Sequence, residues 1–233
     1  MREYWSKRGA LPAPTFAALR EAMLASPLVG GSTLAGPFEA SRGFAVTFRA
    51  EGRARVIERF PALAPHLAAV LGPPAVRALT PWWRRTLTRL PNAWYLNVLL
   101  VSAGGTVARH VDATLRKPSG VDDSLPELVS VLYLSVPAHR GGELLLWDGP
   151  DPIAQLVPEE NGLVHFRGDL AHQVCAFEGP QGALRASLVI EQYHFAPEAL
   201  ARLPEFQLES RAGFSAYLKH HSGRPGASFE LEP

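Results

Sequence analysis

The chain from residue 93 onward reads as an almost unbroken run of short strands, and this run limits the fold more than any other feature. Segments rich in Val, Leu and aromatic residues alternate with turns marked by glycine. The expected strands are 93–103, 106–115, 128–137, 143–147, 163–166, 172–177 and 184–195. No long helical pattern separates them, so a parallel sheet of strand–helix–strand units is not expected. The pattern predicts two packed sheets, as a sandwich or a double-sheet jelly roll.

The residues before this run mix helical and strand patterns. A helix is expected after Thr15, which we predict to be its cap; its buried face would carry Phe16, Leu19 and Met23. A second helix is expected over 60–71, because apolar residues recur there at helical spacing and Gly72 and two prolines follow.

Short segments at both ends complete the expected organisation. A strand is predicted over 43–49 and a helix over 211–221. We expect one domain over 1–233, mostly β with flanking helices. Its expected parts are a support region of helices and a strand (1–92), a β core (93–195) and a C-terminal extension (196–233). Whether residues 1–90 form a lid, a homodimer interface or support for the core stays open.

Composition and charge narrow the expected partners. Hydrophobic residues make up 47% of the chain, which is enough for a substantial buried core. With 23 basic and 22 acidic side chains, the near-neutral chain gives no reason to expect nucleic acid or a membrane as its main partner. Cys175 is the single cysteine, so no internal disulfide can form. These features predict a cytoplasmic protein.

The triplet His110-Val111-Asp112 is the first feature that suggests chemistry. Alternate side chains of a strand face the same way, so the triplet would present an imidazole and a carboxylate to one metal ion. His172 begins a later expected strand and could add a third ligand. Two histidines and one carboxylate are the donor set of non-haem iron(II) oxygenases. The alternative is a histidine that lies near an aspartate by coincidence.

Arg185 and Ser187 share one face of the expected strand 184–195. An arginine among Leu184, Leu188 and other apolar residues is costly to bury unless an anion pairs with it. A guanidinium and a hydroxyl could together bind a carboxylate. A hairpin through 179–182 is expected to bring this strand beside that of His172. The alternative is an edge-strand arginine that reaches solvent.

The order of these motifs resembles the iron(II)/2-oxoglutarate oxygenase superfamily, and its prolyl-hydroxylase-like branch most. The matching elements, over residues 93–195, are H-x-D at 110–112, G-G-E-L at 141–144, N-G-L-V-H-F at 161–166, His172 and R-x-S at 185–187. One departure is that the anchoring basic residue of that branch usually lies nearer the distal histidine, so this chain needs a longer loop there.

The resemblance implies a double-stranded β-helix (jelly roll) core and a set of ligands. Fe(II) would be bound by His110, Asp112 and His172, and 2-oxoglutarate by Arg185 with Ser187. With O2 such enzymes hydroxylate an unactivated carbon and release succinate and carbon dioxide. In related halogenases a small residue replaces the carboxylate ligand, so the presence of Asp112 favours hydroxylation or another oxygen-based outcome.

Four further residues are candidates for contacts in the site. Tyr95 and Asn97 share one face of the strand 93–103 and could hydrogen-bond the co-substrate, although Asn97 could equally mark a β-bulge. Arg116 and Trp147 flank the expected mouth and could contact the substrate, although both could be ordinary rim side chains.

The substrate class is only broadly limited. The resemblance implies a small molecule or peptide: an amino acid, a peptide or a natural product. Two alternatives from other classes are a cupin-like metal enzyme, which would not need Arg185 and Ser187, and a non-catalytic β-barrel that binds a metal or small ligand.

Overall fold

Two antiparallel sheets face each other in the computed structural model of the protein, which describes residues 3–31, 41–73, 78–79, 90–137 and 140–212. The larger sheet has the spatial order β1-β10-β6-β13-β4-β3-β14, with β2 paired to β3. These strands are β1 (Tyr4–Lys7), β2 (Gly30–Gly31), β3 (Arg42–Arg49), β4 (Ala93–Ser102), β6 (Leu128–Ser135), β10 (Leu163–Arg167), β13 (Leu184–Tyr193) and β14 (Phe206–Ser210).

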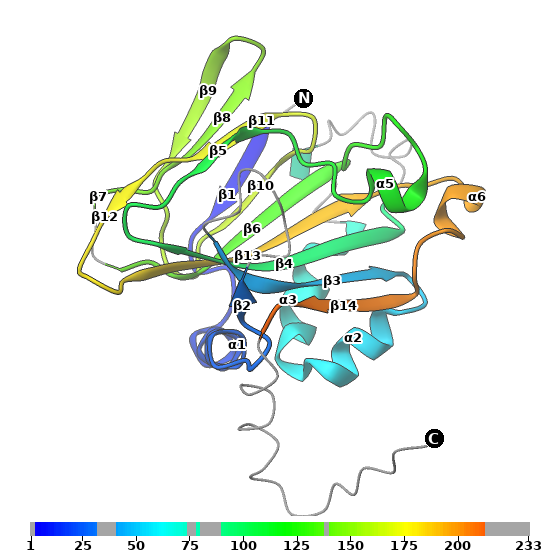
Figure 1. Ribbon diagram of the computed structural model, residues 1–233, viewed down its shortest axis with the longest axis horizontal. Helices are drawn as coiled ribbons and strands as arrows, with labels where there is room; N and C mark the ends of the chain where they lie inside the picture. Colours follow the sequence, from blue (N-terminus) through cyan, green and yellow to red (C-terminus); the bar gives the residue numbers. More distant parts are fainter. Residues whose placement is uncertain (1–2, 32–40, 74–77, 80–89, 138–139, 213–233) are drawn as a thin grey trace, which may run out of the picture.

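The smaller sheet lies over one face of the larger one (Figure 1). Its order is β5-β11-β8-β9, and the β8–β9 hairpin projects at one edge of the molecule. The strands are β5 (Val107–His110), β8 (Leu144–Asp148), β9 (Asp151–Leu156) and β11 (Ala171–Val174), with β7 (Arg140–Gly141) and β12 (Phe177–Glu178) as a separate pair.

Helices cover the opposite face of the larger sheet (Figure 1). They are α1 (Ala13–Leu24), α2 (Arg53–Arg59), the 3-10 turn η2 (Pro61–Leu63) and α3 (Ala64–Val70). Two short helices, α5 (Arg116–Ser119) and α6 (Pro197–Leu200), lie outside this layer. No helix in the described ranges is long and apolar enough to cross a membrane.

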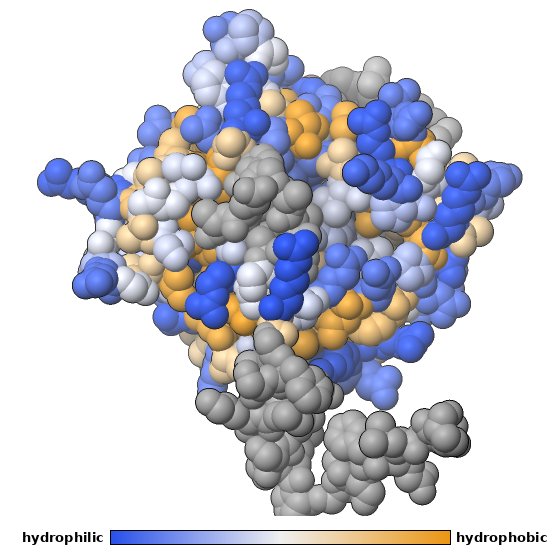
Figure 2. All heavy atoms as spheres, viewed as in Figure 1, coloured by the Kyte–Doolittle hydropathy of each residue, from blue (hydrophilic) through white to orange (hydrophobic). Residues whose placement is uncertain are grey.

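The alternation of side chains along the central strands builds two separate cores. Leu96, Val98 and Leu100 of β4 pack with the helices, whereas Leu99 and Val101 face the smaller sheet. Strands buried on both faces carry apolar residues at most positions, which is why this part of the sequence reads as a nearly continuous apolar run. On the visible face in Figure 2, hydrophilic side chains project from the rim and hydrophobic ones lie deeper between them.

The predicted fold class is confirmed: the structure is mostly β, with flanking helices and a jelly-roll core. The core strands agree with the predicted ones within a few residues, except at two places. The expected strand 106–115 ends already at His110, because the chain turns into a loop and α5. The expected strand 172–177 is split into β11 and β12.

The predicted helices bury the residues that were expected, but they begin and end at different residues. Helix α1 buries Phe16, Leu19 and Met23 as predicted, but it begins at Ala13, so Thr15 is inside the first turn and is not the cap. Pro14 explains the earlier start, because its fixed φ suits the first helical turn. The expected helix over 60–71 is η2 followed by α3, since Pro61 lacks the N–H that would continue α2.

Eight elements were not expected from the sequence: β1, β2, α2, α5, β7, β9, α6 and β14. Strand β9 carries Pro152 and lies at an edge of the smaller sheet, where a missing N–H is tolerated. The helix expected over 211–221 falls almost wholly outside the described residues. Of its residues, Arg211 forms an isolated bridge with Gly31.

Gly43 allows the close contact between β3 and β4, and its replacement should destabilise the fold. A Cβ at Gly43 would lie 1.7 Å from the carbonyl oxygen of Val98, and the backbone φ is 154°. We expect Gly43→Ala to lower the free energy of unfolding by about 2–4 kcal/mol. Chemical denaturation would measure this, with Gly31→Ala as the control because nothing lies within 4 Å of a Cβ there. Equal stability of the two variants would contradict the prediction.

Candidate metal centre

His110, Asp112 and His172 come together at one end of the space between the sheets. His110 is the last residue of β5 and is paired directly with His172 of β11. Asp112 lies two residues beyond the end of β5, so the strand geometry assumed from the sequence holds for His110 only. Asp112 and His172 are buried, each 7% exposed, and His110 is partly buried.

The three side chains could hold a metal ion. One ligand atom of each lies within 4.8 Å of those of the other two. The Nε2 atoms of His110 and His172 are 3.3 Å and 3.4 Å from the carboxylate oxygens of Asp112. On the other side of the rings, Nδ1 of His110 lies 2.8 Å from the Ala108 carbonyl oxygen, and Nδ1 of His172 lies 3.2 Å from the Leu170 carbonyl oxygen. A backbone acceptor at Nδ1 fixes the ring and directs Nε2 toward the metal position.

The charges of the three groups depend on one another. Burial favours the neutral form of Asp112, but the nearby His172 and His110 outweigh burial and lower the pKa of Asp112. Burial by itself would lower the pKa of His110, yet the hydrogen bond and charge of Asp112 raise it overall. Burial lowers the pKa of His172. The site therefore favours an ionised carboxylate, which suits a divalent cation.

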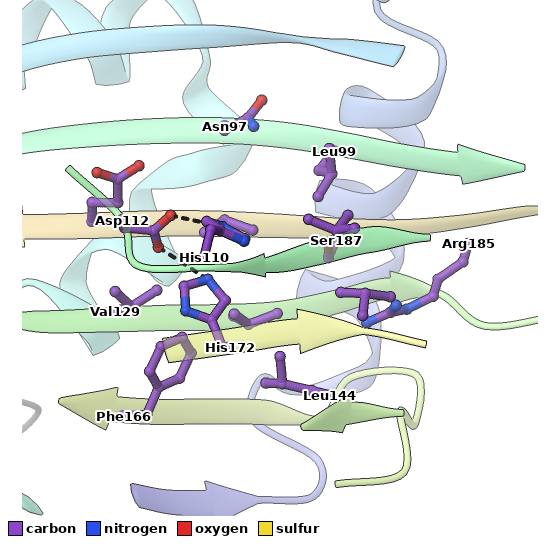
Figure 3. Close-up of a pocket in the computed structure, with 15 residues that line it drawn as sticks. Asn97, Leu99, His110, Asp112, Val129, Leu144, Phe166, His172, Arg185 and Ser187 are labelled. Atoms are coloured by element: carbon purple, nitrogen blue, oxygen red, sulfur yellow. Dashed lines mark ion pairs between the residues drawn. The ribbon is translucent and has the colours of Figure 1, made fainter. Parts of the chain in front are cut away.

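A cavity between the sheets joins this cluster to a buried arginine. Figure 3 shows Asp112 toward one end, Arg185 toward the other, and the two histidines and Ser187 between them. Most of its remaining lining is apolar: Leu99, Val107, Val129, Val131, Leu144, Phe166, Val174 and Val189. Such a lining keeps water away from the polar groups.

Arg185 is 4% exposed and has no carboxylate within ion-pair distance among the described residues. Its guanidinium carbon lies 5.1 Å from the centre of the Tyr133 ring, and its Nε has no hydrogen-bond partner. Burial lowers the pKa of Arg185, although the guanidinium stays protonated at neutral pH. The nearby charge of Glu143 partly offsets this effect, and the position of the guanidinium in the cavity would allow it to pair with an anionic ligand.

The structure corrects the expected hairpin between the strands of His172 and Arg185. Strand β13 pairs with β4 and β6 in the larger sheet, whereas β11 lies in the smaller sheet. Arg185 therefore faces the His110–Asp112–His172 cluster across the cavity. The chain after β11 crosses from one sheet to the other through β12, which a jelly roll requires and a local hairpin pattern does not reveal.

The four remaining candidates are placed differently. Asn97 lines the cavity, and β4 keeps a regular register there, so it does not mark a bulge. Tyr95 is buried and packed with Tyr193 and its neighbours, and it is not among the residues that line the cavity. Arg116 is exposed at the start of α5, and Trp147 stacks beneath Arg109 at 4.3 Å; neither lines the cavity.

Glu191 lines the cavity and was not found by the sequence analysis. Burial, and then the charge of Asp112, raise the pKa of Glu191 to about 8, against hydrogen bonds from Thr114 and Tyr193. A signal existed in the sequence, because Glu191 has the same strand parity as Arg185 and Ser187.

Removing a ligand should abolish tight metal binding. We expect His172→Ala and Asp112→Ala to weaken Co(II) binding by more than about a hundredfold, beyond the loss typical of residues that only support a ligand. Titration followed by visible absorption would measure it. His194→Ala is the control, because His194 is only partly buried, does not line the cavity and is hydrogen-bonded to the Leu90 carbonyl. Wild-type affinity in either ligand variant would exclude the cluster as the metal site.

Metal affinity should rise with pH. A metal binds the unprotonated imidazole, so the proton that Asp112 stabilises on His110 must leave. Because the pKa of His110 is raised, we expect Co(II) affinity to fall as pH decreases through a value above about 6.5. Calorimetry in two buffers of different ionisation enthalpy would detect the released proton. Affinity that is constant between about pH 6 and pH 8 would contradict this.

Comparison with known proteins supports the fold of an oxygenase. No protein-family model matches the sequence, and a search of curated proteins finds no match. Among solved structures, a prolyl-4-hydroxylase from Pseudomonas putida matches with a TM-score of 0.55 and 18% identity, over 84% of this chain and 94% of that one. A 2OG-Fe(II) oxygenase family oxidoreductase from Burkholderia pseudomallei gives 0.51 and 15%, over 82% and 84%.

A third match links the same fold to bound co-substrate. The viral collagen prolyl hydroxylase of Paramecium Bursaria Chlorella virus-1, solved as its 2OG complex, gives a TM-score of 0.50 and 14% identity, over 83% of this chain and 97% of that one. The resemblance read from the sequence motifs is thus confirmed at the level of the fold. The chain has the jelly-roll fold of the 2-oxoglutarate–iron(II) oxygenases, including prolyl 4-hydroxylases.

Proposed function

We propose that this protein is an iron(II)- and 2-oxoglutarate-dependent oxygenase that hydroxylates an unactivated carbon of an amino acid, a peptide or a natural product. The observation that carries the proposal is the buried Arg185, which forms no ion pair with a carboxylate of the described ranges and lies in the same cavity as the His110–Asp112–His172 cluster. A metal site alone would fit many proteins. A metal site with an unmatched buried cation fits a ligand that chelates the metal at one end and carries an anion at the other.

The residues of the cluster fit iron(II). Two imidazoles and one carboxylate leave positions open for a chelating co-substrate and O2. In this role His110, Asp112 and His172 hold the metal, and the Ala108 and Leu170 carbonyls keep the two rings oriented. Iron(II), with 2-oxoglutarate and O2, would supply the oxidising power, and the co-substrate would leave as succinate and carbon dioxide.

Arg185 and Ser187 would bind the distal carboxylate of 2-oxoglutarate. Both lie on the cavity face of β13, and Ser187 lies between Arg185 and the cluster in Figure 3. A planar guanidinium can donate two parallel hydrogen bonds to a carboxylate, and the hydroxyl can donate a third. The surrounding valines and leucines strengthen these bonds by excluding water.

The substrate would approach the end of the cavity that holds the metal ligands. The co-substrate would fill the part between the metal and Arg185. Asn97, which also lines the cavity, is a candidate for a hydrogen bond to a bound ligand near the metal. The prolyl hydroxylases among the structural matches act on proline, as their names state. A peptidyl or free amino acid is therefore the first class to test.

Arg185→Ala should weaken 2-oxoglutarate binding and spare the metal. Loss of a buried charge partner costs about 2 kcal/mol or more, which corresponds to a loss of affinity of about 30-fold or more. Anaerobic titration of the iron(II)-loaded protein with 2-oxoglutarate would measure it through the visible charge-transfer band of the chelate. Arg185→Lys should be intermediate, because it keeps the charge and loses the paired donors.

The control is Arg167→Ala, since Arg167 pairs with Asp169 outside the cavity. Unchanged affinity in Arg185→Ala would assign the anchor to another residue. A wild-type protein that binds iron(II) and shows no response to 2-oxoglutarate would favour the cupin-like or non-catalytic alternative.

A further inference from the structure

The loop that carries Asp112 is hydrogen-bonded to a buried carboxyl group of the larger sheet, next to Leu115, which packs against Tyr193 of the same sheet. The pairing of β5 with β11 ends at His110, so ladder hydrogen bonds do not fix the position of Asp112. Two residues later, the Thr114 hydroxyl donates to Oε1 of Glu191 at 2.6 Å, and the Thr114 backbone N–H donates to Oε2 at 3.2 Å. Glu191 lies on β13, on the opposite side of the cavity from β5.

Glu191 is itself held rigidly. It is 3% exposed, and the hydroxyl of the buried Tyr193 donates to its Oε2. Tyr193 stacks on Phe195 with ring centres 5.4 Å apart. Both carboxylate oxygens are therefore engaged by donors of the chain, and none of the described salt bridges gives Glu191 a cation.

Burying a carboxyl group costs free energy even in the neutral form that the raised pKa of Glu191 favours, and its hydrogen bonds to the loop offset part of that cost. Two hydrogen bonds to one residue fix both the position and the rotation of the backbone at Thr114, and so limit where the Asp112 carboxylate can lie. Groups that orient metal ligands in this way typically change metal affinity by about 10- to 100-fold.

We infer that Glu191 is a positioning residue, which sets the Asp112 carboxylate at the metal centre by holding Thr114. This inference rests on the proposed metal site and adds a residue to it. It also places two supports of the site on one strand: Arg185 at one end of β13 for the co-substrate and Glu191 near the other for the metal loop.

The test is a Co(II) titration of the full-length protein and its variants, followed by visible absorption. We expect Glu191→Ala to weaken Co(II) binding by about 10- to 100-fold and to change the ligand-field spectrum. Thr114→Val should reproduce part of this loss, because it removes one of the two bonds without disturbing the sheet. Thr114→Ser should restore wild-type affinity, since it keeps the hydroxyl.

The matched control is Gln192→Ala. Gln192 is the next residue of the same strand, equally buried and similar in size, and it bonds Ser130 and the Val70 carbonyl on the opposite face. Its loss should lower the free energy of unfolding without changing Co(II) affinity or the spectrum. Denaturation curves of all variants would separate loss of stability from loss of metal binding.

The double variant Glu191→Ala/Thr114→Val gives a second test. If Glu191 acts through Thr114, its effect on Co(II) affinity should be smaller than the sum of the single effects. Additive effects, or wild-type affinity and spectrum in Glu191→Ala and Thr114→Val, would overturn the inference while leaving the metal site intact. A wild-type protein that does not bind Co(II) or iron(II) would instead overturn the proposed function.

Discussion

The pairing of β13 with β4 and β6 is the constraint on which the rest of the structure depends. All ten residues of β13 pair with β4, and seven of them pair with β6 on the other side. With both edges paired and both faces covered, the strand cannot shift by one residue, because such a shift would exchange its two faces. Leu188 and Ile190 would then enter the cavity, and Arg185 and Glu191 would enter the helix core.

This fixed register explains how the protein can keep ionisable and polar side chains in its interior, where burial costs free energy. Arg185, Ser187 and Glu191 lie at alternate positions on the cavity face of one rigid strand, among apolar neighbours. Rigid strands hold side chains more precisely than loops do. The proposed metal ligands, in contrast, come from the smaller sheet and the loop after β5, so the cavity with all of these groups forms only when the two sheets face each other.

The three parts of the proposed site thus have different supports. His110 and His172 are fixed by strand pairing and by backbone acceptors at Nδ1. Arg185, the proposed anchor of 2-oxoglutarate, is held by its burial between the two sheets. Asp112 differs from both, because it lies beyond the end of its strand, and two hydrogen bonds from Thr114 to Glu191, with the packing of Leu115 on Tyr193, connect its loop to the larger sheet.

The sequence by itself determined the mostly β fold class, the boundaries of most core strands and the three residues that the structure brings together as a possible metal site. These features depend on local patterns: the alternation of side chains, the turn residues, and an H-x-D triplet with a later histidine. It did not reveal that Arg185 faces the cluster from the opposite sheet, nor that Glu191 holds the loop of Asp112. Only the tertiary structure decided these, because the choice of strand partners depends on contacts between residues far apart in the chain. Because side chains of a strand alternate between its two faces, the spacing of Arg185, Ser187 and Glu191 places them on one face of β13. The alternation does not reveal which residues lie opposite that face.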